Sequence, residues 1–261
     1  MINLKQAASF IETRRQRILN ILGQYGHVKV TFLADELSTS PLTIRRDLEY
    51  LEQQRLLERH YGGATLLNPV STSFSSTLVL HKHAIAQEAA KLVADRDSIF
   101  INTSSTATLI LKYITAKNVT VITNNAKAIQ CERSSDILVV LTGGELREPK
   151  ESMVGDFALN NLMRVTASKC FLGCAGLTPD QGLTTSVLQE ASINETMLKR
   201  ATERIILADH SKIGKTQSFV SGNLRAGDRI ITDTEAPRSI LDRFRKMGIE
   251  VIQVPPLRSL K

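Results

Sequence analysis

Cysteine is scarce and long apolar runs are missing from this 261-residue chain. The three cysteines, Cys131, Cys170 and Cys174, form too small and odd a set for a disulfide framework, which indicates a reducing compartment. No histidine lies near the last two, so we expect buried thiols, and the sequence predicts no metal and no cofactor. The chain contains no run of 18 apolar residues, so no membrane span is predicted. The N-terminus also lacks the apolar stretch of a secretory signal. These absences predict a cytoplasmic protein with no membrane partner.

Length and composition are typical of a globular protein with two domains. Hydrophobic residues make up 42% of the chain and charged residues 23%, which is enough apolar material to bury a core. The formal net charge is +7, of which residues 1–65 carry +2 and the remainder +5. A basic balance permits nucleic-acid binding. Because the excess is not concentrated at the N-terminus, that function has to be argued from sequence pattern.

Residues 1–65 contain three stretches with the periodicity of helices, at about 11–24, 32–37 and 41–54, and a short alternating run at 27–30. The third helix has the clearest start, because Ser40 offers a capping oxygen and Pro41 suits the first helical position. Its apolar residues Ile44, Leu48 and Leu51 share one face and predict a contact with the core.

The exposed first turn of this third helix carries hydroxyl groups and arginines. In a helix-turn-helix, that end of the recognition helix enters the major groove, where an arginine bonded to guanine O6 and N7 gives about 1–3 kcal/mol of discrimination. Residues 56–65 then alternate around a turn and predict a β-hairpin wing. Taken singly, these features also fit a small helical bundle with a solvated arginine pair. The predicted DNA contacts are Ser40, Leu42, Thr43, Arg45, Arg46, Arg59, His60, Gly62 and Gly63.

The order of these features resembles a known family. The stretch VTFLADELSTSPLTIRRDLEYLEQQRLLERHYGGA, residues 30–64, closely resembles the N-terminal domain of DeoR-family bacterial transcriptional regulators, in which TIRRDL precedes a wing ending in HGGA. Residues 43–48 match the first motif, and Tyr61 replaces the histidine of the second. The resemblance implies a winged helix-turn-helix domain over residues 1–65 that binds a double-stranded DNA operator.

Strands and helices alternate through the rest of the chain. A Ser/Thr-rich stretch at 66–80 predicts a linker, and a second domain is expected at 81–261. Short β-rich runs lie at 98–101, 119–122, 137–141, 169–172, 205–208, 230–231 and 249–254. Helical patterns lie at 84–93, 106–114, 187–201 and 238–247. This alternation predicts an α/β domain with a mostly parallel sheet and helices on both faces.

Polar residues follow several of these strands. Ligands of such sheets bind beyond the carboxyl ends of the strands, and hydroxyls and free N–H groups at a helix start suit a phosphate. Each polar strand end alone fits an ordinary turn or cap, but several ends of one sheet converge on one crevice. The effector contacts predicted in this way are Asn102, Ser104, Ser105, Thr106, Asn124, Gly143, Gly144, Gly176, Asp209 and Lys212.

The second domain resembles the DeoR-type C-terminal sensor, which is related in fold to ribose-phosphate isomerases and CoA transferases. The matching positions are 123–124, 143–144, 155, 182–184, 190 and 208–212. The resemblance implies a phosphorylated sugar or related metabolite as effector, contacted by Lys212, with Asp209 and Glu190 accepting hydroxyl protons. One loop departs from the family, because Asn102 replaces an acid and Ser104 replaces a glycine. The Cβ of Ser104 either crowds a phosphate or brings a hydroxyl donor.

These features favour a ligand-controlled repressor of carbohydrate-metabolism genes, in which the effector binds best to the arrangement that cannot hold DNA. The family implies a homo-oligomer, a dimer or tetramer, whose two-fold symmetry matches paired half-sites. Two alternatives stay open. One is a sugar-phosphate isomerase-like enzyme with a DNA-binding head, although the sequence contains no convincing catalytic constellation and fold does not imply function. The other is a DNA-binding protein that ignores ligands, which the altered loop would favour.

Overall fold

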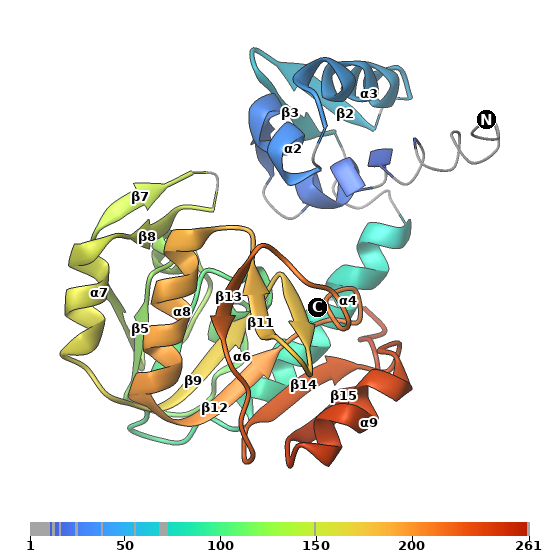
Figure 1. The fold of residues 1–261 in the computed structure, drawn as a ribbon. Coiled ribbons are helices and arrows are strands. Elements are labelled where there is room, and N and C mark those ends of the chain that lie inside the picture. The colour runs from blue at the N-terminus through green and yellow to red at the C-terminus, as the bar shows by residue number, and fades with distance from the viewer. Residues whose placement is uncertain are drawn as a thin grey trace. The chain divides into compact units, whose positions relative to one another are not determined.

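The computed structural model describes residues 11, 14–15, 17–23, 26–37, 39–54, 56–67, 73–148 and 150–259, with the side chains of 73–76 excepted. The chain divides into two compact units, Met1–Thr77 and Leu78–Lys261, and each is described by itself (Figure 1). No helix among these residues is both long enough and apolar enough to cross a bilayer.

The N-terminal unit is a winged helix-turn-helix, as the sequence predicted. After helical residues 17–23 come α2 (Val30–Glu36) and α3 (Pro41–Gln53). The antiparallel sheet has the order β1 (His27–Lys29), β3 (Gly63–Leu66), β2 (Leu57–His60), and β2 and β3 form the wing. Ile44, Leu48 and Leu51 are buried in the core of this unit. The second helix begins at Val30, earlier than predicted, because the extended residue Lys29 occupies its N-cap.

A helix replaces most of the predicted linker. Leu66 ends β3, and α4 (Ser73–Ala90) begins only a few residues later, so an irregular linker over 66–80 is wrong for 73–80. Residues 68–72 of that linker lie outside the described residues. The Ser/Thr-rich composition is typical of a loop. However, the chain continues into Ala84 and Ile85, whose burial against the sheet stabilises the whole helix.

The second unit is built on a seven-stranded sheet in which every neighbouring pair is parallel. All seven predicted strands are present, so the predicted α/β fold is confirmed. The strand order is β15 (Glu250–Val254), β14 (Arg229–Asp233), β12 (Ala201–Leu207), β9 (Ala167–Gly173), β4 (Ser98–Ile101), β5 (Val119–Thr123) and β6 (Ile137–Leu141). Because all strands run the same way, their carboxyl ends share one edge of the sheet.

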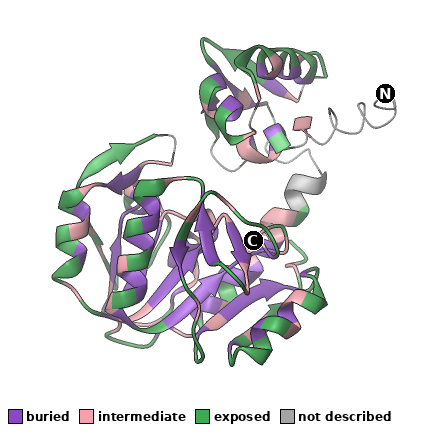
Figure 2. Cartoon of the chain, viewed as in Figure 1, coloured by how far each residue is buried: buried purple, intermediate pink, exposed green. Residues whose placement is uncertain are grey.

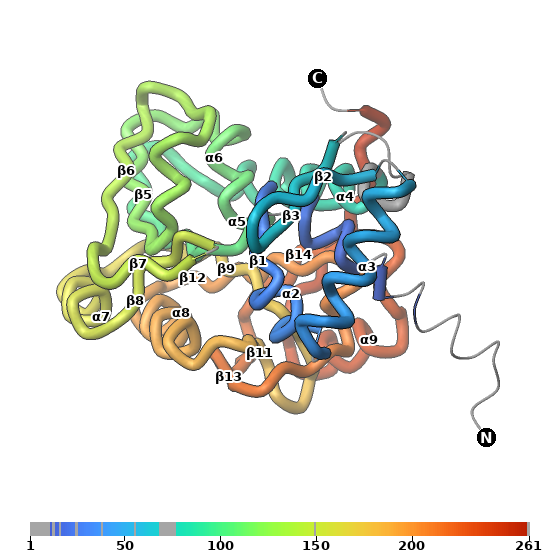
Figure 3. The backbone as a smooth tube through the Cα atoms, turned by 90° about the horizontal axis from the view of Figure 1, so that it is seen from above, coloured from blue at the N-terminus to red at the C-terminus, as the bar shows by residue number. Residues whose placement is uncertain are grey.

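Helices cover both faces of this sheet, and alternate residues along each strand serve the two faces. Ile99 and Ile101 of β4 pack with α4, α5 (Ser105–Thr108) and α6 (Ile110–Tyr113), whereas Phe100 packs with α7 (Asp156–Met163), α8 (Leu188–Arg200) and α9 (Arg238–Lys246). Figure 2 shows the strands as the most buried layer, and Figure 3 shows α6 and α8 on opposite sides of it.

Several short elements escaped sequence prediction. These are α7, the hairpin β7 (Glu145–Arg147) with β8 (Ser152–Val154), the 3-10 helix η1 (Ala126–Gln130), and a small sheet of β10 (Gly176–Thr178), β11 (Gly182–Thr185) and β13 (Phe219–Gly222). Three or four residues per strand are too few for a clear period. The cysteines are free thiols as predicted, but only Cys170 is buried, and burial raises its pKa to about 12.

Candidate nucleic-acid interface and candidate anion site

The first turn of α3 presents the residues that the sequence assigned to DNA. Ser40 caps the helix, because its Oγ accepts a hydrogen bond from the Thr43 N–H at 3.2 Å. Leu42 is 56% exposed. Arg45 and Arg46 are exposed, and neither side chain has a hydrogen bond or ion pair with any residue that the structure describes. Both guanidinium groups are therefore open to a phosphate or to the edge of a guanine.

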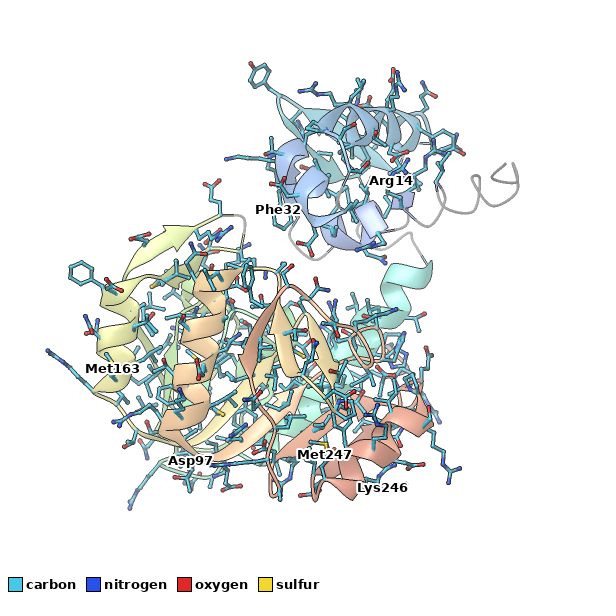
Figure 4. All side chains as sticks on the ribbon, viewed as in Figure 1. Arg14, Phe32, Asp97, Met163, Lys246 and Met247 are labelled. Carbon is cyan, nitrogen blue, oxygen red and sulfur yellow. The ribbon has the colours of Figure 1, made fainter. Side chains whose placement is uncertain are left out.

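A buried carboxylate fixes α3 to the helical residues that precede it. Asp47 is only 2% exposed, and its oxygens accept hydrogen bonds from Nε of Arg14 (labelled in Figure 4) at 2.5 Å and from Nε of Arg15 at 3.0 Å. The Arg15 guanidinium also lies 3.5 Å from the centroid of the Tyr50 ring. Sequence reasoning missed this role. The available signal was an acid within the apolar stripe, one turn after Ile44.

The wing offers a different set of groups. Glu52 of α3 accepts hydrogen bonds from the Arg59 Nε at 2.6 Å and the Arg59 N–H at 3.0 Å, and these bonds lower the pKa of Glu52. Arg59 therefore anchors the wing to α3 before any DNA is bound. His60 and Gly62 are exposed, and Gly62 takes the turn conformation with φ +80°. Tyr61, which sequence reasoning did not select, is fully exposed at the tip.

Three of the predicted contact glycines have a packing role. At each of them, a Cβ would overlap a backbone carbonyl oxygen of a neighbouring segment. The pairs are Gly63 with Val28, Gly144 with Val154, and Gly176 with Lys215. Gly63 and Gly176 are also buried, and their contacts with DNA and with effector stay predictions.

Asn102 closes the carboxyl ends of the two central strands β4 and β9. Its Nδ2 donates to the Gly173 carbonyl at 2.9 Å and to the Asn194 Oδ1 of α8 at 3.0 Å. Its Oδ1 accepts from the N–H groups of Gly173 at 3.1 Å and Ser104 at 3.3 Å. The side chain is 3% exposed. Every polar atom of this amide is thus used inside the protein, so its observed role is to hold β4, β9 and α8 together, and its contact with effector stays a prediction. A carboxylate could not make the two donations.

Ser104 occupies space that Gly173 leaves open. A Cβ on Gly173 would overlap both the Oγ and the Cβ of Ser104. The Ser104 Oγ lies 3.5 Å from the Ala107 N–H and caps α5. The side chain that replaces the family glycine is therefore accommodated by a glycine on the neighbouring strand. The sequence left two roles open for Ser104, crowding of a phosphate by its Cβ or donation from its hydroxyl group. The structure adds a third role, in which Ser104 packs against Gly173 of β9.

A charge cluster, made up of Lys82, Asp209 and Lys212, lies next to Ser105. Lys82 of α4 donates from its Nζ to the Ser105 Oγ at 3.4 Å. Asp209, which follows β12, is 1% exposed. Burial alone would raise the Asp209 pKa, but the nearby charges of Lys212 and Lys82 and a hydrogen bond from Ser211 hold it below its usual value. Burial lowers the pKa of Lys82, and repulsion from Lys212 adds to this effect. The negative charge of Asp209 acts in the opposite direction but does not cancel it. The cluster thus holds two lysines, Lys82 and Lys212, and one buried carboxylate, that of Asp209.

The structure brings together the predicted residues Ser105, Asp209 and Lys212, and it adds Lys82. Sequence reasoning missed Lys82 because the predicted helix began at Ala84. The available signal was the polar run of residues 81–83 at the start of the second domain.

The other predicted effector residues lie along the same edge of the sheet. Glu190 of α8 is buried, and its Oε2 accepts from the Lys150 Nζ at 3.1 Å and the Thr185 Oγ1 at 3.3 Å. Asn124 is buried and donates from its Nδ2 to the Met153 carbonyl at 3.1 Å. The Glu190 Oε1 and the Asn124 Oδ1 have no hydrogen-bond partner among the described residues. Of the remaining two predicted positions, Thr106 is buried and Gly143 is half-buried with φ +70°.

Comparison with known proteins assigns both units. The family model described as the DeoR-like helix-turn-helix domain matches residues 14–70, and the DeoR C terminal sensor domain matches residues 79–234. Similar proteins are the uncharacterized HTH-type transcriptional regulator YulB of Bacillus subtilis (strain 168), 34% identical over 94% of this chain and 97% of that protein, and the lactose phosphotransferase system repressor of Streptococcus mutans, 33% identical over 86% and 92%. The glycerol-3-phosphate regulon repressor of Escherichia coli (strain K12) is 27% identical over 87% of this chain and 93% of that protein.

Proposed function

Because the chain belongs to the DeoR family of transcriptional regulators, we propose that it represses carbohydrate-metabolism genes and releases its operator when its sensor unit binds a phosphorylated sugar or polyol. The charge cluster carries the proposal. Lys82 donates to the Ser105 Oγ at 3.4 Å, and Lys82 and Lys212 both act on the buried Asp209, so the cluster holds two lysines and one acid with which to meet an anionic group. Two similar proteins are named as repressors of a lactose phosphotransferase system and of a glycerol-3-phosphate regulon.

The orphaned acceptors along the same edge support the hydroxyl-rich part of this ligand. The Glu190 Oε1 and the Asn124 Oδ1 are buried without a hydrogen-bond partner among the described residues. A buried polar atom in that state costs about 1–3 kcal/mol, which the hydroxyl groups of a sugar or polyol would recover. Both atoms are acceptors when Glu190 is ionised, as a ligand with several O–H donors requires.

Repression rests on α3 and on linkage between the two units. Arg45 and Arg46 supply the open guanidinium groups that would read base edges. An effector that binds the DNA-incompetent state more tightly by about 1–3 kcal/mol would lower operator affinity roughly 5–150-fold. A homodimer or tetramer with two-fold symmetry would place two copies of α3 on paired half-sites.

The test is operator binding by the purified protein to its own upstream DNA at fixed salt. Phosphorylated sugars and polyols are added in turn, each beside its unphosphorylated counterpart. We expect one phosphorylated compound to release the DNA and its counterpart to have little effect. Unchanged affinity across the whole panel would favour a DNA-binding protein that ignores ligands. Turnover of a sugar phosphate in the same samples would favour the enzyme alternative.

A lysine substitution locates the response. Lys212→Ala is expected to bind the operator normally and to lose release by the active compound, because Lys212 belongs to the charge cluster. Lys199→Ala is the matched control, since its ammonium is exposed on α8 and pairs only with Glu195 at 2.5 Å among the described residues. Normal release from the Lys212→Ala protein would remove this residue from the site.

A further inference from the structure

Two histidines and two acids meet at the carboxyl ends of β12 and β14. His81 comes from α4, and His210 follows β12. Asp233 ends β14, and Glu235 lies just beyond it. The side chains of His81 and Asp233 are completely buried, while that of His210 is 26% exposed. The cluster adjoins Lys82 and Asp209 in the chain but shares no residue with the charge cluster.

The two imidazole rings present matching atoms to the two acids. The His210 Nδ1 lies 3.1 Å from each Asp233 oxygen, and the His81 Nδ1 lies 3.9 Å from the Asp233 Oδ2. The opposite nitrogens face Glu235, with His81 Nε2 at 3.2 Å and His210 Nε2 at 3.5 Å from its oxygens. One ligand atom from each of His81, His210 and Asp233 lies within 4.8 Å of the others.

One of these atoms lacks a partner. The His81 Nδ1 is buried and makes no hydrogen bond with any residue that the structure describes, although it points toward the Asp233 carboxylate. If the His81 Nε2 carries the proton and donates it to Glu235, Nδ1 holds a free lone pair. A buried lone pair with no donor is unfavourable. A cation between the rings and Asp233 would satisfy it.

We propose that His81, His210 and Asp233 bind a divalent transition-metal ion, with Zn²⁺ the best match to two imidazoles and a carboxylate. Glu235 accepts the Nε2–H of both rings and so fixes the tautomer in which each Nδ1 is free to coordinate. Asp233 is already oriented, because its oxygens accept hydrogen bonds from the backbone N–H groups of His210 at 2.7 Å and Glu235 at 2.9 Å. Three protein ligands leave one coordination position for water.

Such an ion would tie α4 to the carboxyl edge of the sheet. Its ligands come from a helix and from the ends of two parallel strands, so the unfolded chain does not hold them together. The same dispersion explains why the sequence predicted no metal, since His81 lies far from the other two ligands in the chain and 154 residues from Glu235, which orients the rings.

The test uses the full-length protein, stripped with a chelator and then titrated with Zn²⁺ or Co²⁺. We expect one equivalent of Zn²⁺ to bind per chain, to raise Tm, and to compete with Co²⁺, whose visible absorption reports imidazole and carboxylate coordination. His210→Gln, at the partly exposed ligand, should abolish one-equivalent binding while operator binding confirms a folded protein. Glu235→Gln should weaken Zn²⁺ binding about 10–100-fold, because the two imidazole rings lose the carboxylate that orients them.

His83→Gln is the matched control. His83 lies on the same helix as His81, but its Nδ1 is 2.7 Å from the Tyr113 Oη and outside the cluster. This variant should bind Zn²⁺ as the unaltered protein does. The proposal is overturned if the unaltered protein binds no equivalent of Zn²⁺, or if His210→Gln and His83→Gln bind it with the same affinity.

Discussion

The two candidate surfaces differ in how their polar groups are used before a ligand arrives. On α3, the side chains of Arg45 and Arg46 have no partner among the described residues. At the carboxyl edge of the sheet, Asn102 makes four hydrogen bonds inside the protein, and Asp209 is held by its neighbours. The exposed arginines can hydrogen-bond to water until DNA replaces it, whereas buried polar groups must hydrogen-bond to one another. A polar residue at a strand end is therefore weaker support for ligand contact than an exposed one on a recognition helix.

The largest expected effect comes from Asp47, the buried group on which the exposed surface depends. Asp47→Ala leaves Arg14 and Arg15 without their shared carboxylate. Breaking a buried pair costs about 3–5 kcal/mol, and because the arginines are 25% and 20% exposed we expect about 2–3 kcal/mol here. Urea unfolding of the full chain, followed by a probe in the N-terminal unit, measures the loss.

An exposed ion pair in the same unit provides the control. Glu52→Ala breaks the Arg59 pair on the surface, where solvent screens the charges, and should cost far less stability than Asp47→Ala. Equal destabilisation by the two variants would mean that Asp47 has no special role in fixing α3.

Gly173→Ala tests whether the sensor edge is as tightly built as its hydrogen bonds indicate. The new Cβ would overlap Ser104, and overpacking of this kind costs about 1–3 kcal/mol. Ser104→Gly should cost only a few tenths of a kcal/mol as a lost cap, and in the double variant it should recover most of the stability. Thermal unfolding of all four proteins gives the coupling. Additive losses would show that the two residues do not share this space.

The sequence predicted the fold well where burial imposes a period. The strands other than the edge strand β6 carry apolar residues that serve two cores, such as Phe100 between Ile99 and Ile101, and this pattern is local. The hairpin of β7 and β8 was missed because its three-residue strands are too short to show a period, and the start of α4 was missed because its Ser/Thr-rich residues are typical of a loop. The candidate site residues differ in the same way: the exposure of Arg45 could be predicted from its helix alone, whereas Lys82 becomes a candidate only once α4 lies beside Ser105.

Arg46→Ala should affect DNA binding without affecting stability, because this side chain has no partner among the described residues to lose. Loss of one bidentate base contact is worth about 1–3 kcal/mol, and we expect about 1.5 kcal/mol, slightly more than tenfold, confined to one base position per half-site. Competition between operator variants measures this preference. Arg46→Lys should keep affinity for random DNA but lose the preference, because lysine lacks the planar fork. A uniform loss across sequences would assign Arg46 to a phosphate.

The smallest expected effect is a pH dependence of effector binding, which follows from the lowered pKa of Lys82. Because the folded protein holds this proton less tightly than the unfolded chain does, stability should rise as pH climbs from the lowered pKa toward the ordinary value of 10.5. Affinity for a phosphorylated effector should fall over the same window, since one of the two ammonium groups loses its charge. Calorimetric titration at a series of pH values rising toward 10.5 measures the decline. Lys82→Arg should flatten it, because a guanidinium stays charged throughout. An equally steep decline in that variant would mean that a group other than Lys82 titrates. The contrast between a buried lysine that titrates at the sensor edge and the exposed, always charged arginines of α3 would then no longer hold.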